Sequence, residues 1–276
     1  MNTKKIMIRS LIYLYLLAVA LSAFYPFFVM VISSTHNHFS IMTSINILPG
    51  NSLIDNWERL TRNINIYQGI VNSLFIAVTA TLLQNYFTLM TGYAFSKFTF
   101  KGREVLFGVI IVVMMLPGQI GIIGFFRTVQ ALGLINSYIP LIVPGIANSF
   151  AVFFYKQYLD GALAHELIEA AVMDGCKELS IFHRIVIPMA KPAIVVQCVL
   201  VFIGSWNAYL TPLIILNDRS RMTLPLLIAT VRDANHAEAG AQYLGMLISI
   251  IPIVIIFCFS SKIIMEKISL GAAVKG

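Results

Sequence analysis

The chain has little charge: Asp, Glu, Lys and Arg make up 11% of its 276 residues, whereas soluble domains carry about 25%. Hydrophobic residues make up 58%. This balance excludes an ordinary soluble protein and predicts one embedded in a bilayer. Cysteine is also scarce. The three cysteines are scattered, one in a polar stretch and two in apolar runs, and suggest neither a disulfide framework nor a metal site.

The motifs of several enzyme classes are absent. There is no Gly-x-x-x-x-Gly-Lys-Ser/Thr phosphate-binding loop and no Gly-x-Ser-x-Gly esterase elbow. His165-Glu166 begins like a zinc-protease helix, but Glu169 stands where the second histidine ligand is required. We therefore predict that the chain is not an enzyme and that it binds no metal or cofactor itself.

Six uncharged runs are long enough to cross a hydrocarbon core, which takes about 20 helical residues. They lie at Leu11–Ile32, Ile70–Phe95, Val105–Phe126, Ile139–Tyr155, Ala193–Leu216 and Ala241–Ser261. The predicted fold class is an all-α integral membrane protein with six transmembrane helices. None of the runs contains Asp, Glu, Lys, Arg or His. Since a proton-coupled pump usually needs a titratable relay in the bilayer, energy for uphill transport is expected to come from another protein.

The first run has two features of a secretory signal: the basic residues Lys4, Lys5 and Arg9 before it, and a small-residue Ala-Val-Ala segment at 18–20. A signal core, however, usually has about 7–15 residues, and here the apolar residues continue to Ile32. We predict a retained transmembrane helix.

The basic residues are divided unequally between the two sides of the predicted membrane. Of the 19 Lys and Arg residues, 13 lie at the two termini, in the loop after the second run and in the loop between the fourth and fifth runs. The other 6 lie in the alternate loops. Because cytoplasmic loops carry the excess of Lys and Arg, both termini and the loop before the fifth run are expected to be cytoplasmic. This pattern explains the net charge of +7 without a nucleic-acid partner.

The second run is too polar for a helix that faces only lipid, with Asn72 and Asn85 among its residues. Polar side chains at membrane depth normally face a bundle interior or an aqueous path. Hydrogen bonding between packed helices and the lining of a solute path are both open interpretations. The breaks at Pro117-Gly118 and at Pro144-Gly145 likewise fit either hinges or close helix packing. The mixed-charge loop from Asn217 to Gly240 fits either a solvated face or a docking site for an external partner.

The stretch from Ala164 to Pro192 is the longest polar segment between two apolar runs. Its first part has residues spaced as one helical face, with alanine at the centre: Leu163, Leu167, Ala170 and Ala171. A small-residue face can seat deeply in a groove of another protein. The bulky apolar residues that lipid-surface helices use are missing, which favours a protein partner over the membrane surface.

A turn is predicted after this helix. Gly175 is expected to end the helix because glycine adopts the left-handed conformation without a Cβ penalty. A second short helical turn follows, and Pro188 and Pro192 are expected to end it before the fifth run. The prediction is a helical hairpin joined to a membrane helix.

The same stretch resembles the EAA loop of bacterial ABC importer permeases, in Glu169-Ala170-Ala171-x-x-Asp174-Gly175 and the following Phe182 and Pro188. Two other segments resemble the maltose-type carbohydrate-uptake branch, and in particular the second of its two permeases. They are Gly204-Ser205-Trp206-Asn207 with Tyr209, and the C-terminal tail Gly271–Gly276. The resemblance covers most of the chain from residue 67 onward. Cys176 and Ala208 depart from the family pattern, in which alanine and an acidic residue are common at these places.

The resemblance implies a type I ABC importer permease (MetI-like) fold with a cytoplasmic coupling helix. It implies a transmembrane core at 67–262 that includes the EAA loop at 159–192, between an N-terminal helix and external segment at 1–66 and a cytoplasmic tail at 263–276. Contact with the ATPase is assigned to Glu169, Ala170, Ala171, Asp174, Gly175, Phe182 and Pro188. The tail residues Gly271, Lys275 and Gly276 are assigned to a contact between the ATPase subunits. The candidate path residues are Asn72, Asn85, Trp206, Asn207 and Tyr209.

By the same resemblance, the chain lies in the bacterial inner membrane as a multi-pass, non-catalytic permease that moves a sugar into the cell. Its expected partners are a second homologous permease, two ABC ATPase subunits that bind ATP and Mg, an extracytoplasmic solute-binding protein and the lipid bilayer. One alternative is an ABC permease for another solute, such as an amino acid or a peptide. Another is a membrane scaffold or an intramembrane enzyme.

Overall fold

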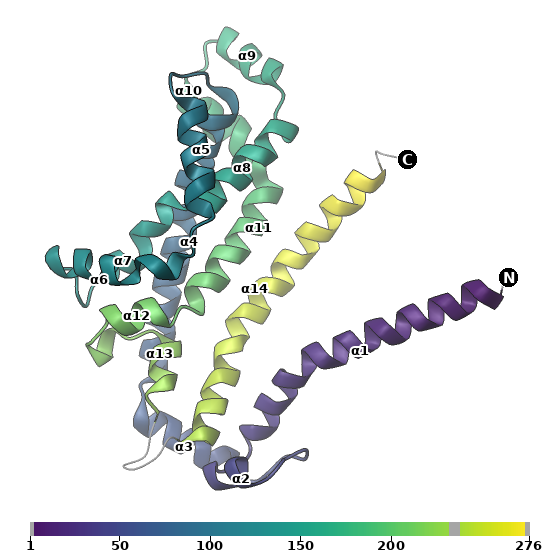
Figure 1. Cartoon of the computed structure of the whole chain (residues 1–276), viewed down its shortest axis with the longest axis vertical. Coiled ribbons are helices and arrows are strands. Elements are labelled where there is room, and N and C mark those ends of the chain that lie inside the picture. Colours follow the sequence, from purple (N-terminus) through teal and green to yellow (C-terminus); the bar gives the residue numbers. More distant parts are fainter. Residues whose placement is uncertain (1–2, 232–237, 274–276) are drawn as a thin grey trace. The chain divides into compact units, whose positions relative to one another are not determined.

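The chain is built of helices, and no strand occurs within residues 3–231 and 238–273, which the computed structural model describes; side chains are described for 7–231 and 238–260. Helices satisfy every backbone N–H and C=O within one segment, as a bilayer requires. In chain order (Figure 1) the elements are α1 (Thr3–Ser33), α2 (His38–Thr43), α3 (Leu53–Asn63), α4 (Ile66–Lys97), α5 (Arg103–Met114), η1 (Gly118–Gly121), α6 (Ile122–Ala131), α7 (Ile139–Ile142), η2 (Val143–Ala147), α8 (Ser149–Ala162), α9 (His165–Met173), α10 (Glu178–Ile181), η3 (Phe182–Val186), α11 (Ile187–Trp206), α12 (Leu210–Ile215), η4 (Arg219–Arg221), α13 (Leu224–Ala229) and α14 (Ala239–Ala273).

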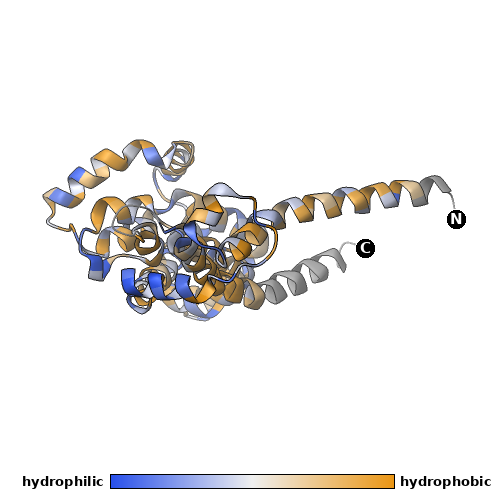
Figure 2. Cartoon of the chain, turned by 90° about the horizontal axis from the view of Figure 1, so that it is seen from below, coloured by the Kyte–Doolittle hydropathy of each residue, from blue (hydrophilic) through white to orange (hydrophobic). Residues whose placement is uncertain are grey.

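Five helical segments are long and apolar enough to cross a membrane: Met7–Ser33, Ile66–Lys97, Ile139–Ala162, Glu178–Trp206 and Ala239–Ser260. A bent pair, Arg103–Met114 with Gly118–Ala131, makes six if it counts as one span. Figure 2 shows hydrophobic residues along most of the helical length, with hydrophilic residues gathered in short stretches. The all-α membrane class is confirmed, and the six predicted runs correspond to these segments.

The third predicted run, Val105–Phe126, is not one straight helix. α5 ends at Met114, and the chain bends by 90° before it continues into α6. Pro117 lies at the bend with an extended ψ of 122°; it lacks a backbone N–H and disfavours a helical conformation in the residue before it. Close packing within the described part of the chain does not explain the glycines here, because a Cβ added at Gly118 or Gly124 would meet no described atom within 4 Å.

The prediction that Pro188 and Pro192 end the short helical turn is wrong. The helix is continuous from Glu178 to Trp206, through α10, the π-helical turn η3 and α11. In η3 the Ile187 N–H donates to the Phe182 carbonyl, one residue further back than in an α-helix. Pro188 lies just after this π-helical turn and Pro192 lies inside α11, and the helix continues through both.

The fifth span also ends earlier than the predicted Leu216. α11 stops at Trp206, with Asn207 as its C-cap residue, and a separate short helix, α12, begins at Leu210. Pro212 lies in the first turn of α12, a position that proline tolerates. Proline is tolerated in the first turn of a helix but breaks a helix interior, so Pro212 favours a separate helix over a longer α11.

Contacts divide the chain into two compact units: residues up to Ile66 with Leu227–Ile251, and Tyr67–Leu226 with the residues from Pro252 onward. In the second unit α8 packs against α5 and α11, and α12 packs against α6 and α7. A buried cluster in this unit joins α4, α8 and the polar stretch through Leu89, Tyr155 and Phe182. This cluster positions the candidate site.

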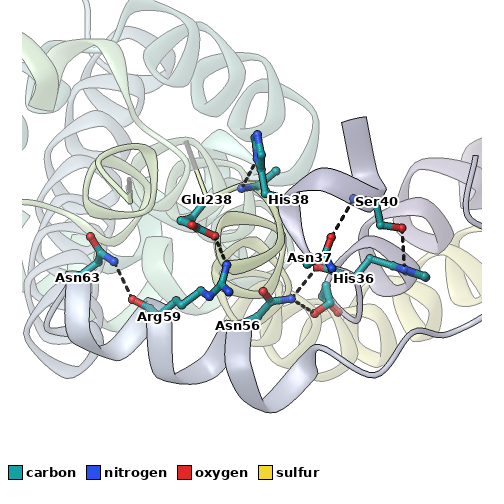
Figure 3. Close-up of polar contacts among 10 residues, drawn as sticks. His36, Asn37, His38, Ser40, Asn56, Arg59, Asn63 and Glu238 are labelled. Atoms are coloured by element: carbon teal, nitrogen blue, oxygen red, sulfur yellow. Dashed lines mark hydrogen bonds and ion pairs between the residues drawn. The ribbon is translucent and has the colours of Figure 1, made fainter. Parts of the chain in front are cut away.

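In the first unit, polar side chains join α3 to the residues after α1 and before α14 (Figure 3). The buried Asn56 amide donates to the backbone oxygens of Ser34 and His36, both at 2.8 Å. The Arg59 guanidinium pairs with the Glu238 carboxylate at 2.7 Å. These contacts hold the beginning of α14 in place.

In the second unit, Asn136 holds the loop that follows α12. It has a positive φ of 60°, a conformation that asparagine tolerates better than most residues. Its side-chain oxygen accepts the N–H groups of Asn217 at 2.5 Å and Asp218 at 2.8 Å. Arg221 donates to its backbone oxygen at 2.6 Å. Hydrogen bonds from Ser220 lower the pKa of the Asp218 carboxyl, so this carboxylate stays charged and keeps the loop capped.

Candidate functional site

The polar stretch folds into a helical hairpin in which α9 is connected to α10 by a tight turn. Figure 1 shows α9 beyond the ends of α8 and α11. α8 leads into it directly, and the continuous helix from α10 to α11 leads away from it. The hairpin is therefore joined at both ends to segments that can cross a membrane.

Gly175 ends α9, as predicted. Its φ is +76°, its N–H donates to the Val172 carbonyl at 2.9 Å, and the Cys176 N–H donates to the Ala171 carbonyl at 3.0 Å. This pair of bonds is a Schellman motif, with glycine at the left-handed position. A Cβ at Gly175 would meet no described atom within 4 Å. The backbone conformation, and not a lack of space, is what requires glycine here.

The predicted apolar face of this helix is divided in the structure. Leu163 and Ala171 are buried in the chain's own cluster, together with Ile168. Leu167 is 41% exposed and Ala170 is exposed. Helical spacing places these residues near one another, but α9 packs against α10, which covers only the side with Ile168 and Ala171.

The opposite side of α9 is open, and we call it the outer face: Glu166, Leu167, Glu169, Ala170 and Met173. Met173 is 86% exposed, and Leu179 of α10 is 62% exposed beside the turn. Scattered apolar residues on a surface are ordinary, but a contiguous group marks a contact site for a membrane or another protein.

Polar contacts tie the hairpin to α4 and α8. Asp160, near the end of α8, accepts a hydrogen bond from Ser96 at 2.7 Å and pairs with Lys156 at 2.6 Å. The Lys97 ammonium donates to the Leu163 carbonyl just before α9. These bonds connect α4 to α8 and to the residue just before α9.

Phe182 is buried and holds the hairpin from the inside. Its ring packs edge-on against Tyr86 of α4, with centroids 5.7 Å apart. The adjacent His183 ring forms a 3.2 Å hydrogen bond to the Tyr86 hydroxyl. Of the residues assigned to the EAA loop, Phe182 and Ala171 thus contact their own chain, whereas the exposed ones are Glu169, Ala170, Asp174, Gly175 and Pro188.

Two of the candidate path residues make hydrogen bonds within the chain. Asn72 donates to the backbone oxygens of Ser220 and Met222, both at 2.9 Å. Asn85 accepts a hydrogen bond from the buried Tyr155 hydroxyl at 2.5 Å. For these two residues the structure favours helix-to-helix hydrogen bonding over the lining of a path.

The other candidate path residues lie together at the end of α11 but differ in exposure. Trp206 is fully buried and stacks on Phe202, with ring centroids 5.8 Å apart. Asn207 and Tyr209 are exposed. The buried ring of Trp206 fits a packing role at the end of α11.

A cavity of 480 Å³ lies in the second unit. Its polar lining residues are Gln84, Asn148, Gln197, Ser205, Thr211 and Thr223. None of them is among the five named candidate path residues, although Gln84 belongs to the polar second run for which path lining was one of two interpretations. One signal was visible in the sequence, because Gln197 is the single amide side chain in the apolar segment 193–206.

We expect Asn85→Leu to reduce stability without changing which solute is transported. The substitution leaves the buried Tyr155 hydroxyl without its acceptor, which costs about 1–3 kcal/mol. The double variant Asn85→Leu/Tyr155→Phe removes both partners and should recover part of this loss. Thermal unfolding of the purified protein measures the effect. Altered solute preference at wild-type stability would instead place Asn85 in the solute path.

The predicted tail residues lie at or beyond the end of the described part of the chain. Gly271 belongs to α14, whereas Lys275 and Gly276 lie outside the described residues. No group of three or more His, Cys, Asp or Glu side chains within the described ranges could hold a metal ion.

Comparison with known proteins gives one consistent result. Residues 84–270 match the family described as binding-protein-dependent transport system inner membrane component. The arabinooligosaccharides transport system permease protein AraQ of Bacillus subtilis (strain 168) is 32% identical over 97% of this chain and 96% of its own length. The lactose transport system permease protein LacG of Rhizobium radiobacter is 32% identical over 87% of both chains.

The fold is shared with solved ABC importers. A chain of a bacterial ABC transporter involved in the import of the acidic polysaccharide alginate matches with a TM-score of 0.79, at 23% identity, over 95% of this chain and 98% of its own. The methionine transporter MetNI matches with a TM-score of 0.55, at 13% identity, over 76% of this chain and 96% of that chain. The predicted MetI-like fold is confirmed. This chain belongs to the family of binding-protein-dependent transport system inner membrane components, the membrane-spanning permeases of ABC importers.

Proposed function

We propose that this chain is the permease subunit that carries an oligosaccharide or a related sugar across the inner membrane, driven by ATP hydrolysis in separate subunits. The observation that carries the proposal is the end-to-end similarity to a permease named for arabinooligosaccharides, and a second relative is named for lactose. The chain itself is non-catalytic in this proposal. A permease for an amino acid or a peptide is the alternative.

The proposed partners follow from the family. Two ABC ATPase subunits bind ATP and Mg, an extracytoplasmic protein delivers the sugar, and a second homologous permease completes the path. The N-terminus, the EAA loop and the C-terminus lie on the cytoplasmic side, in keeping with the 13 basic residues on that side. The tail that begins at Gly271 reaches between the ATPase subunits.

The outer face of α9 is the proposed contact with an ATPase subunit. Ala170 lets the helix approach closely, Leu167 and Met173 supply apolar surface, and Glu169 pairs with basic residues of the partner. When the ATPase subunits close, α9 moves with them. The bonds from Ser96 and Lys97 carry this movement into α4. The two access states are a two-state equilibrium, which the ATPase can bias only by contacting them differently.

A panel of solutes tests the substrate class. We expect ATP hydrolysis by the complete complex, with its solute-binding protein, to rise with one or more of arabinotriose, lactose, maltotriose and diacetylchitobiose, because a sugar-loaded binding protein favours the ATP-hydrolysing state. Glycine, methionine and a tripeptide serve as controls and should give no response. A response to an amino acid or peptide alone would replace the sugar with the alternative substrate.

A further inference from the structure

We propose that the 480 Å³ cavity of the second unit is where this chain contacts the transported solute, and that it takes an uncharged, hydroxyl-rich molecule through Gln197 and Thr223. The proposal rests on the proposed function and identifies the residues of the path. Gln197 and Thr223 replace Asn72 and Asn85 as candidate path residues, because the amides of Asn72 and Asn85 make hydrogen bonds within the chain.

The cavity brings together residues that are far apart in the sequence. Its wall includes Gln84 of α4, Asn148 before α8, Gln197 of α11 and Thr223 after η4. All lining residues lie between 76 and 223, within the second unit. The volume falls in the range of small-molecule sites, roughly 300–1,000 Å³.

The lining contains no Asp, Glu, Lys, Arg or His. An amino acid or peptide carries charged groups, and such groups are costly to desolvate unless a countercharge meets them. A neutral sugar carries none and instead presents hydroxyl groups that donate and accept. Gln197 can do both through its amide, and Thr223 through its hydroxyl. Apolar lining residues such as Leu200 and Phe150 offer surface to the C–H groups of a sugar ring.

Gln197 and Thr223 have unused hydrogen-bonding groups. Gln197 is 2% exposed and Thr223 is 3% exposed. No partner within the described part of the chain bonds to the Gln197 Nε2 or the Thr223 Oγ1. Buried polar side chains are normally paired, so each exception needs an explanation. Both residues line the same cavity, and a change of side-chain rotamer would bring each unpaired group to the hydroxyls of a solute passing through it.

Glycine keeps part of the cavity open. Gly204 lies on α11 and lines the cavity, and a Cβ there would meet no described atom within 4 Å. A larger side chain at this position would therefore occupy the cavity without displacing the backbone. Gly124 of α6 is a matched position: it is also free of contacts within 4 Å, and it does not line the cavity.

The test measures sugar uptake by the complete complex in proteoliposomes, using the panel sugar that stimulates the wild type. We expect Gly204→Phe to reduce uptake to background while the second permease and both ATPase subunits still co-purify. Gly124→Phe should keep the wild-type rate. Gln197→Leu should raise the KM for uptake about tenfold, because the solute loses a hydrogen-bond partner at a buried site.

A variant with a smaller side chain, Gly204→Cys, tests the cavity if the Gly204→Phe chain does not assemble with its partner subunits. With the three native cysteines replaced by alanine, a water-soluble thiol reagent should modify Gly204→Cys, and the sugar-loaded binding protein with ATP should slow that reaction. Wild-type uptake by Gly204→Phe, or no protection of Gly204→Cys, would overturn the inference. Loss of only the second permease from Gly204→Phe would also overturn it, because the cavity would then seat a helix of that permease.

The two proposals can fail separately. If the wild-type complex transports none of the panel sugars, the proposed function fails and the inference falls with it. If the wild type transports a sugar and the Gly204 and Gln197 variants behave like it, only the assignment of the cavity is wrong.

Discussion

The Gly175→Pro variant is expected to lose ATP-driven uptake and to lose the ATPase subunits during purification. Proline fixes φ near about −65°, whereas Gly175 has a φ of +76° and donates its N–H to Val172. The substitution therefore breaks both bonds of the Schellman motif and changes the direction in which α10 leaves α9. The outer face of α9 is then no longer presented in the geometry that its partner fits.

Two further substitutions at Gly175 are expected to reduce ATP-driven uptake and ATPase binding by smaller amounts. Gly175→Asn should keep most of the activity, because asparagine tolerates the left-handed conformation. Gly175→Ala should be intermediate, at a cost of about 1–2 kcal/mol. Co-purification of the ATPase subunits and binding-protein-stimulated ATP hydrolysis are the two measurements.

Gly133 provides a matched control at the end of α6. It has a φ of +68°, and the Gly133 and Leu134 N–H groups donate to Gln130 and Val129 in the same pattern. Gly133→Pro breaks an identical motif outside the hairpin, so it should leave the ATPase subunits bound. Loss of the subunits in both proline variants would indicate general misfolding instead of a docking defect.

A charge reversal tests the same contact without altering the backbone. Glu169 is exposed on the outer face, so Glu169→Lys should weaken binding of the ATPase and leave the thermal stability of the permease unchanged. If the ATPase subunits are retained at wild-type amounts in both Gly175→Pro and Glu169→Lys, the assignment of α9 as the docking helix is wrong.

The second large effect is expected at Gly240, where even a methyl group should destabilise the first unit. A Cβ at this position would lie 2.3 Å from the His36 backbone oxygen and 2.6 Å from the Asn56 Nδ2. Both atoms belong to the hydrogen bond that Asn56 donates to His36 at 2.8 Å. Gly240→Ala is therefore expected to cost roughly 2–4 kcal/mol, from overpacking and from the weakened buried bond.

The destabilisation expected for Gly240→Ala is opposite to the usual effect of this substitution. Within a helix, replacing glycine by alanine ordinarily stabilises by about 0.5–1 kcal/mol. Gly108 of α5 is the matched control, since a Cβ there would meet no described atom within 4 Å. We expect Gly108→Ala to unfold at the wild-type temperature or above and Gly240→Ala to unfold well below it. Equal unfolding temperatures for the two variants would contradict the contact around Gly240.

Several properties of the protein follow from the sequence alone. Long uncharged runs cross a bilayer as helices, so the membrane class and the approximate places of the spans were predictable, but the bend in the third span and the early end of the fifth were not. The glycine in the Glu169–Gly175 segment predicted the end of α9, because few other residues adopt a positive φ. The residue types and spacing of the same segment were enough to indicate the importer family. Each of these depends on local composition or local backbone geometry.

Other properties depend on contacts between distant residues, and only the tertiary structure decided them. Helical spacing grouped Leu163, Leu167, Ala170 and Ala171, but packing against α10 determined which of them are covered. Asn72 finds its partner Met222 150 residues away, whereas the Gln197 Nε2 and the Thr223 Oγ1 find none in the described chain. Uncharged polar residues therefore make hydrogen bonds between segments of the chain at one position and line a cavity at another. The physical reason is that a side chain's role depends on whether its hydrogen bonds are satisfied in the folded chain, and this cannot be read from its neighbours in the sequence.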